Sequence, residues 1–289
     1  MTRRMGGAIA AAWLLFVAGP ALARPPVWTV TGGKGMLVLF GSMHALPPGL
    51  DWRPPALTAA LQEADELWFE LPVDEASDEE AARLAVKRGE APAGDSLFDH
   101  LTPHQSERLR AAALNLGLAA PALAAMRPWL ADVTLSLAID ARAGARPGEG
   151  VEEQLQAAAP ARVRRRALET PGAQIGFLAG AAVADQVASL EATLTEIEDH
   201  PDAYRRLVAD WLAADLVGLT ADALEPLQRA SPALYRRLMT DRNRRWSVVL
   251  QRRMARPGRI VVVVGMGHLL GPGGVPALLR AKGFHVEGP

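Results

Sequence analysis

Six short runs of apolar, β-branched and aromatic residues predict the strands of a sheet. They cover residues 27–31, 36–40, 66–71, 163–169, 259–264 and 284–287. Several of these runs are continuously apolar instead of alternating with polar positions, and this pattern is typical of strands that are buried on both faces. The stretch Ile-Val-Val-Val-Val at residues 260–264 is the clearest, and we expect it to form a central strand.

The segments between these runs show apolar residues at helical spacing. Residues 72–162 and 171–256 are rich in Ala, Leu, Arg and Glu. One helix start can be read directly, because Thr102, Pro103 and Gln105 form the pattern of a capping box with proline at the first helical position. The sequence therefore predicts an α/β fold with a central, mainly parallel or mixed sheet and a large helical middle segment. No Ser/Gly linker divides it, so we expect a single domain over residues 24–289.

The first 23 residues have the pattern of a secretory signal peptide. Arg3 and Arg4 precede an apolar run of about 10 residues, and Ala21-Leu22-Ala23 fits a small-residue cleavage site. Such a run is well short of the ~20 residues that a membrane-spanning helix needs. We therefore expect cleavage near Ala23, a periplasmic or secreted protein, and no stable membrane anchor after cleavage.

Charge and cysteine content narrow the chemistry. Without residues 1–23 the chain loses two of its 31 basic side chains and none of its 32 acidic ones, which leaves a net charge of −3. That balance offers no electrostatic footprint for DNA or RNA, so we expect no nucleic-acid partner. The chain contains no cysteine, which excludes thiol catalysis, disulfides and cysteine–zinc sites.

Two segments share one plan, in which an apolar strand runs into Gly-x-x-His. The first is Gly41-Ser-Met-His44 and the second is Gly265-Met-Gly-His268. Glycine permits a sharp turn at the strand exit, and each histidine then projects near the carboxyl end of its strand, where ligands bind in open α/β sheets. A single histidine of this kind is usually structural, but two in the same setting favour metal binding or proton transfer.

Acidic residues end two other predicted strands. Glu70 follows an apolar run and is closed by Pro72, and Glu169 is followed by Thr170-Pro171. A carboxylate beside a buried apolar run is costly unless it is paired or coordinated. The structural alternative is a salt bridge or a helix-capping role, above all for Glu169 beside a helix start. We expect both carboxylates within side-chain reach of the two histidines, because the strands align their carboxyl ends.

Three other motifs do not fit their usual context. His100 and His104 have the spacing of a zincin helix, but a helix start lies between them. The letters Gly94-Asp-Ser-Leu97 match an esterase motif, yet they follow no strand. The run from Gly265 to Gly271 lies too near the C-terminus for a dinucleotide loop, which needs a following βαβ unit.

In their order along the chain, these residues resemble the TraB/GumN family, which includes the TIKI proteins. The matching pieces are Gly41-Ser-Met-His44, Glu70 in Trp-Phe-Glu, Arg127-Pro128-Trp129, Leu168-Glu169-Thr170 with Gln174, Asp241-Arg242-Asn243 with Trp246, and the run from Val264 to Pro272. The resemblance implies an α/β fold distantly similar to the erythromycin-esterase and ChaN-like proteins. Relatives tend to carry Gly-Val-Asp where this chain has Gly150-Val151-Glu152, so Glu152 is a secondary candidate.

The resemblance also implies a function. The TIKI branch is described as metal-dependent proteases, whereas the GumN and TraB names come from polysaccharide and plasmid-pheromone contexts. We therefore expect an exported metal-dependent hydrolase, a peptidase, with His44, Glu70 and His268 around a divalent ion, either manganese, cobalt or zinc. Such an ion would polarise a carbonyl and activate a bound water.

Three further residues receive roles in this prediction. Glu169 is the expected general base, Arg242 the expected oxyanion stabiliser, and Asn243 the residue that orients a peptide or small-molecule substrate. The alternative is a non-catalytic protein of the same fold that binds or sequesters a peptide or saccharide, since the same histidines and acids would serve both functions.

Overall fold

The computed structural model describes residues 24–289, and the predicted signal peptide at residues 1–23 lies outside them. Six strands form one mixed sheet in the order β4-β3-β5-β2-β1-β6. Their bounds are β1 (Val27–Thr31), β2 (Gly35–Ser42), β3 (Glu66–Phe69), β4 (Arg164–Ala167), β5 (Gly258–Gly265) and β6 (His285–Glu287). Strands β4, β3, β5 and β2 are parallel, whereas β1 runs antiparallel to both β2 and β6. Each of the predicted strands is present.

Helices fill most of the remaining chain. They are α1 (Pro55–Glu63), α2 (Glu75–Gly89), α3 (Pro103–Leu116), α4 (Ala120–Ala124), α5 (Pro128–Arg142), α6 (Val151–Ala158), α7 (Pro171–Ala179), α8 (Val183–Asp199), α9 (Ala203–Ala213), α10 (Leu216–Ala223), α11 (Glu225–Ala230), α12 (Pro232–Tyr235), α13 (Asp241–Met254) and α14 (Val275–Ala281), with the short turns η1 (Leu97–His100), η2 (Arg236–Thr240) and η3 (Met266–Leu269). Thr102 and Gln105 form the predicted capping box at the start of α3. The predicted α/β fold with a helical middle segment is confirmed.

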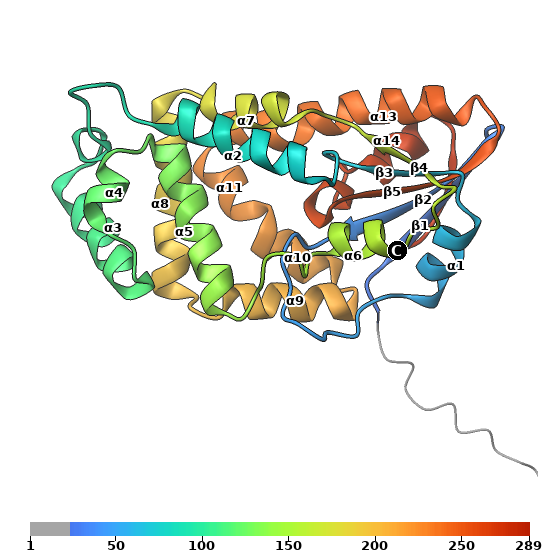
Figure 1. Cartoon of the computed structure of the whole chain (residues 1–289), viewed down its shortest axis with the longest axis horizontal. Coiled ribbons are helices and arrows are strands. Elements are labelled where there is room, and N and C mark those ends of the chain that lie inside the picture. The colour runs from blue at the N-terminus through green and yellow to red at the C-terminus, as the bar shows by residue number, and fades with distance from the viewer. Residues whose placement is uncertain (1–23) are drawn as a thin grey trace, which may run out of the picture.

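The sheet lies at one end of the molecule and helices α3, α4, α5 and α8 lie at the other (Figure 1). Two apolar clusters correspond to these ends. One surrounds the sheet, and the second packs Leu109, Leu135 and Leu190 between the helices. Strand β5 lies between β3 and β2, and its residues 260–264 are at most 1% exposed. The prediction of a central strand buried on both faces is therefore confirmed.

The register of the parallel strands brings the sequence motifs to one edge. Gly41 pairs with Val264 across β2 and β5, so the two Gly-x-x-His loops leave the sheet side by side. Glu70 directly follows β3, and the amide of Glu169, just after β4, donates to the carbonyl of Glu70 at 2.9 Å. Both glutamates thus lie at the same carboxyl edge as the histidines, as predicted.

No single helix within residues 24–289 is both long and apolar enough to cross a bilayer. Helices α7 and α8 reach the required length and composition only together, and they are bent by 91° at the break between them. Leu190 and Leu194 of α8 are fully buried in the helical cluster.

Candidate active site

The first Gly-x-x-His loop is held by the helices around it. Trp211 of α9 donates from its indole nitrogen to the carbonyl of Gly41 at 2.9 Å, and the Tyr204 hydroxyl donates to the carbonyl of the residue after His44 at 2.8 Å. A Cβ atom at Gly150 would lie 2.3 Å from the carbonyl oxygen of His44. Only glycine therefore lets helix α6 begin this close to the loop, and this approach brings the first turn of α6 beside His44.

That first turn carries Glu152, which binds His44. One oxygen, Glu152 Oε1, lies 2.7 Å from His44 Nδ1 and accepts from the Ser42 hydroxyl at 2.6 Å. The His44 side chain is nevertheless 70% exposed and lines a cavity. The negative charge of Glu152 raises the pKa of His44, and Glu70 adds to this with a smaller effect. His44 is therefore charged at neutral pH, with Nδ1 held by Glu152.

The second histidine has a different environment. The His268 side chain is 6% exposed, and its ring packs against Trp246 with 4.4 Å between ring centroids. Its Nδ1 lies 2.6 Å from Oδ1 of Asn243, and its Nε2 lies 3.0 Å from Nη1 of Arg242. Burial, followed by the charge of Arg242, lowers the pKa of His268 to about 4, although Glu70 opposes the shift. His268 is therefore neutral at neutral pH.

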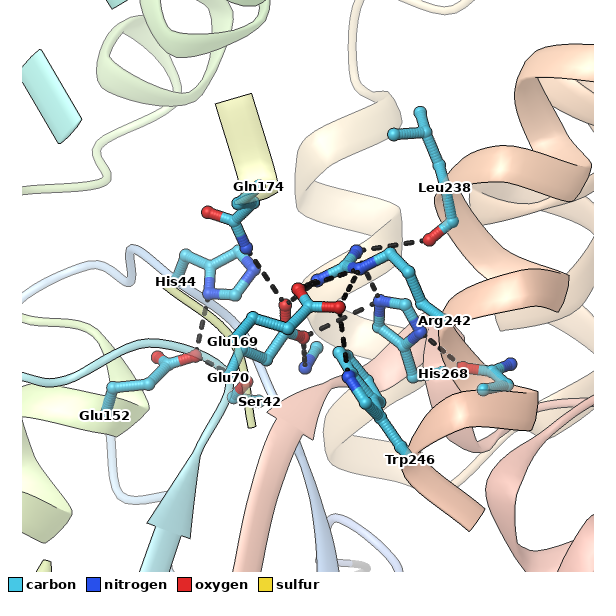
Figure 2. Close-up of polar contacts among 12 residues, drawn as sticks. Ser42, His44, Glu70, Glu152, Glu169, Gln174, Leu238, Arg242, Trp246 and His268 are labelled. Atoms are coloured by element: carbon cyan, nitrogen blue, oxygen red, sulfur yellow. Dashed lines mark hydrogen bonds and ion pairs between the residues drawn. The ribbon is translucent and has the colours of Figure 1, made fainter. Parts of the chain in front are cut away.

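Glu70 lies between the two histidines, as Figure 2 shows. Its Oε1 accepts from the backbone amide of Gly265 at 2.7 Å, and its Oε2 accepts from Arg242 at 2.6 Å and from Gln174 at 3.2 Å. A Cβ at Gly265 would lie 3.3 Å from Glu70 Oε1 and 3.4 Å from His44 Nε2. The missing side chain of Gly265 thus lets the His44 ring and the Glu70 carboxylate approach one point in the cavity.

The charge state of Glu70 follows from these neighbours. Burial by itself raises the pKa of Glu70, but positive groups and a backbone donor outweigh it. These groups are His268 when its ring is protonated, Arg242, His44 and the Gly265 amide, and together they hold the pKa at about 2. Glu70 is therefore a carboxylate throughout the neutral range.

Glu169 lies behind Glu70 and binds Arg242 with both oxygens. Arg242 Nε lies 3.1 and 3.0 Å from the two Glu169 oxygens, and Nη2 lies 2.8 Å from Oε2. The indole nitrogen of Trp246 donates to Glu169 Oε1 at 3.0 Å. Glu70, Arg242 and Glu169 form a buried ion-pair network across the ends of β3 and β4, with helix α13 supplying the arginine (Figure 2).

A cavity of about 980 Å³ opens above this network. His44, Glu70, Gln174, Arg242 and His268 contribute to its polar floor. Its walls are largely apolar and come from helices α5, α7, α9, α10 and α11. The helical middle segment therefore encloses the strand ends, so a ligand bound over His44 would be partly shielded from water.

The predicted site residues fall into two groups. His44, Glu70, Arg242 and His268 line the cavity, whereas Glu169 and Asn243 do not. Asn243 is 3% exposed, and its Nδ2 donates to the Gly273 carbonyl at 2.9 Å while its Oδ1 faces His268. Asn243 therefore orients the His268 ring. The catalytic roles expected for Glu169, Arg242 and Asn243 stay predictions.

Sequence reasoning identified some contacts only in part. Glu152 was a secondary candidate, yet it is the direct partner of His44. Ser42 and Gln174 belong to the motifs shared with the family, although the sequence predicts no role for them. Ser42 binds Glu152, and Gln174 binds Glu70. The only local signal for Glu152 is its place two residues after Gly150, at the start of a helix.

The three expected metal ligands do not form a set of free donors. His268 Nε2 faces an Arg242 N–H, and Glu70 Oε2 is paired with the same guanidinium. Among residues 24–289, no group of three or more His, Asp or Glu side chains is arranged to hold a metal ion. The donor arrangement therefore does not fit a divalent ion shared by His44, Glu70 and His268.

Fold and site together define an α/β protein whose parallel strand ends carry two histidine loops around a buried Glu–Arg–Glu network. The chain belongs to the TraB/PrgY/gumN family, whose sequence model matches residues 26–288. It is 30% identical over 258 residues to the uncharacterized protein YbaP of Escherichia coli K12, covering 89% of this chain and 92% of that protein. YbaP of Shigella flexneri is also 30% identical, over 84% of this chain and 87% of its own. No solved structure matches the chain.

Proposed function

We propose that this protein is an exported hydrolase that acts on peptide bonds, with His44 and Glu70 as the catalytic groups. The observation that carries the proposal is the position of His44, which is exposed in the cavity while Glu152 holds Nδ1. Its Nε2 and Glu70 Oε1 both face the space that the missing side chain of Gly265 leaves open. Environments that push the pKa values of two neighbouring groups apart are typical of acid–base pairs. The choice of peptide bonds rests on the family resemblance.

The reaction that fits this geometry uses one proton donor and one carboxylate. Glu70 orients a water molecule and accepts its proton as the water oxygen attacks the carbonyl carbon. Charged His44 donates the proton on Nε2 to the leaving amine as the carbon–nitrogen bond breaks. Solvent then returns the proton from Glu70 to His44. Activity should hold across neutral pH and fall as pH rises through the raised pKa of His44.

A divalent ion stays a prediction and takes no part in this sequence of steps. If bound, such an ion would supply Lewis-acid polarisation of the carbonyl. The nitrogen of His268 and one oxygen of Glu70 that it would need are both engaged by Arg242.

The second candidate is a non-catalytic protein that binds or sequesters a peptide or saccharide. The polar floor of the cavity favours it, because the buried charges of Glu70 and Arg242 are already paired with each other. Such a floor can orient a ligand without taking part in chemistry.

Incubation of the mature protein with a library of fluorogenic unstructured peptides distinguishes these two functions. We expect cleavage by the wild type and a rate lower by about 10²- to 10⁴-fold in His44→Ala, because a positioned acid contributes that much. His104→Ala is the matched control, since this exposed histidine is on α3, away from the cavity. Peptide binding without any cleavage product in the wild type would refute the hydrolase and support the binding protein.

A further inference from the structure

Arg242 uses all of its hydrogen-bonding capacity inside the protein. An arginine side chain has five N–H donors and no acceptor. Nε and Nη2 donate to Glu169 and Glu70, and Nη1 donates to the Leu238 carbonyl at 3.1 Å. The remaining N–H of Nη1 faces His268 Nε2 at 3.0 Å. The side chain is 7% exposed, so water has little access to these contacts.

This contact determines which nitrogen of His268 carries the hydrogen. Because the guanidinium can only donate, His268 Nε2 must accept through its lone pair. The hydrogen is then on Nδ1, where Asn243 Oδ1 accepts it at 2.6 Å. The Asn243 amide is oriented independently, since its Nδ2 donates to the Gly273 carbonyl. The lone pair that would bind a metal ion at His268 is therefore occupied.

The charges of the buried side chains also indicate that Arg242 occupies the position of a metal ion. Glu70 and Glu169 are both buried carboxylates, and Arg242 pairs with each of them at 2.6 and 2.8 Å. The guanidinium of Arg242 also makes cation–π contacts with Trp246 and Phe177, whose ring centroids lie 4.7 and 5.6 Å from its central carbon. Buried carboxylates need a cation nearby, and in many hydrolases a divalent ion supplies it. In this site the Arg242 side chain supplies that positive charge.

We propose that Arg242 is the resident cation of this site and takes the place of the divalent ion that the paired motifs would otherwise hold at Glu70 and His268. Removing Arg242 then frees two carboxylates and one imidazole nitrogen, which converts the same residues into a site for a divalent transition-metal ion. In the wild type, Arg242 is a positioning residue that holds Glu70 Oε2 and leaves Oε1 to the backbone amide of Gly265. The proposal does not depend on hydrolysis, because neither of its tests measures activity.

The first test uses the wild-type protein and nitrogen-15 NMR of the histidine rings. We expect His268 to show the neutral form with hydrogen on Nδ1, and to keep those shifts when one equivalent of Zn²⁺ is added. A change in the Nε2 resonance of His268 on adding Zn²⁺ would overturn the proposal, because it would mean that the ion displaces Arg242.

The second test compares Zn²⁺, Mn²⁺ and Co²⁺ binding by calorimetry in chelator-treated proteins. We expect Arg242→Met to bind Zn²⁺ at least about 10-fold more tightly than the wild type, the scale on which neighbours of metal ligands act. Arg245→Met is the matched control, since Arg245 lies on the same helix, 3.9 Å from Glu169, and is half exposed. It should behave like the wild type. A folded Arg242→Met protein with no gain in affinity contradicts the proposal, and if that variant does not fold, the NMR result decides.

Discussion

The two Gly-x-x-His loops have the same local sequence plan and opposite environments. His44 is 70% exposed and its partner is the carboxylate of Glu152, whereas His268 is 6% exposed and sits between Arg242 and Asn243. The pKa of the first is raised and that of the second is lowered to about 4. The motif therefore decides where a histidine stands at the strand end, and its neighbours decide whether the histidine can exchange protons with a substrate.

The largest expected difference between the loops is in folding stability. His268→Ala leaves one N–H of Arg242 and Oδ1 of Asn243 without a partner in a buried site. We expect a loss of about 2 to 6 kcal/mol in the free energy of unfolding, since each of the two unsatisfied buried groups costs about 1 to 3 kcal/mol. Urea unfolding measures it, with His44→Ala as the comparison at a loss of about 1 kcal/mol, because its ring is mostly in solvent. Equal losses in both variants would remove the distinction between the loops.

The acid side of the pH–stability curve should report His268. Its pKa is about 4 in the folded protein and about 6.5 when unfolded, so between these values the unfolded chain binds the extra proton. The stabilisation is complete above the unfolded pKa and is lost as pH falls toward 4, by up to about 3 kcal/mol. Thermal melts between pH 4 and 7 should show this decline, and His268→Gln should flatten it. An unchanged slope in that variant would assign the effect to other groups.

The alkaline side should report His44, with the opposite sign. Its pKa is raised in the folded protein, so the folded state holds a proton that the unfolded chain releases near pH 6.5. This stabilisation is present below the unfolded pKa and is lost as pH rises through the folded pKa. Because solvent screens the pair, we expect about 1 kcal/mol or less. Thermal melts of the wild type and of Glu152→Gln between pH 7 and 10 measure this contribution. If the stability of Glu152→Gln depends on pH as strongly as that of the wild type, Glu152 is not its cause.

The smallest expected effect comes from the hydroxyl that supports Glu152. Ser42→Ala removes the donor at 2.6 Å but leaves His44 on the same oxygen. We expect a loss of about 0.5 kcal/mol in unfolding free energy, at the lower end for a single hydrogen bond. Urea unfolding measures it, and peptide-cleavage assays should show a KM close to that of the wild type. A loss as large as that of His268→Ala would mean that the first loop is as structural as the second.

Much of the fold and part of the site could be predicted from local sequence. Continuous apolar runs identified strands β2 and β5, because burial on both faces demands them, and the Thr102 capping box located the start of α3. The glycines before His44 and His268, and the glutamates after β3 and β4, indicated the sheet edge where the candidate site lies. Parallel strands align their carboxyl ends, so these residues were expected to meet there.

The sequence by itself determined which residues stand at the strand ends, and only the tertiary structure decided their partners. Glu152 is 108 positions from His44, and Arg242 is 172 positions from Glu70. No local pattern encodes such a pairing, because it depends on how α6 and α13 pack against the sheet. The protonation of the two histidines depends on the same packing. Burial and nearby charges shift a pKa only once distant segments have come together, and that separates His44 from His268.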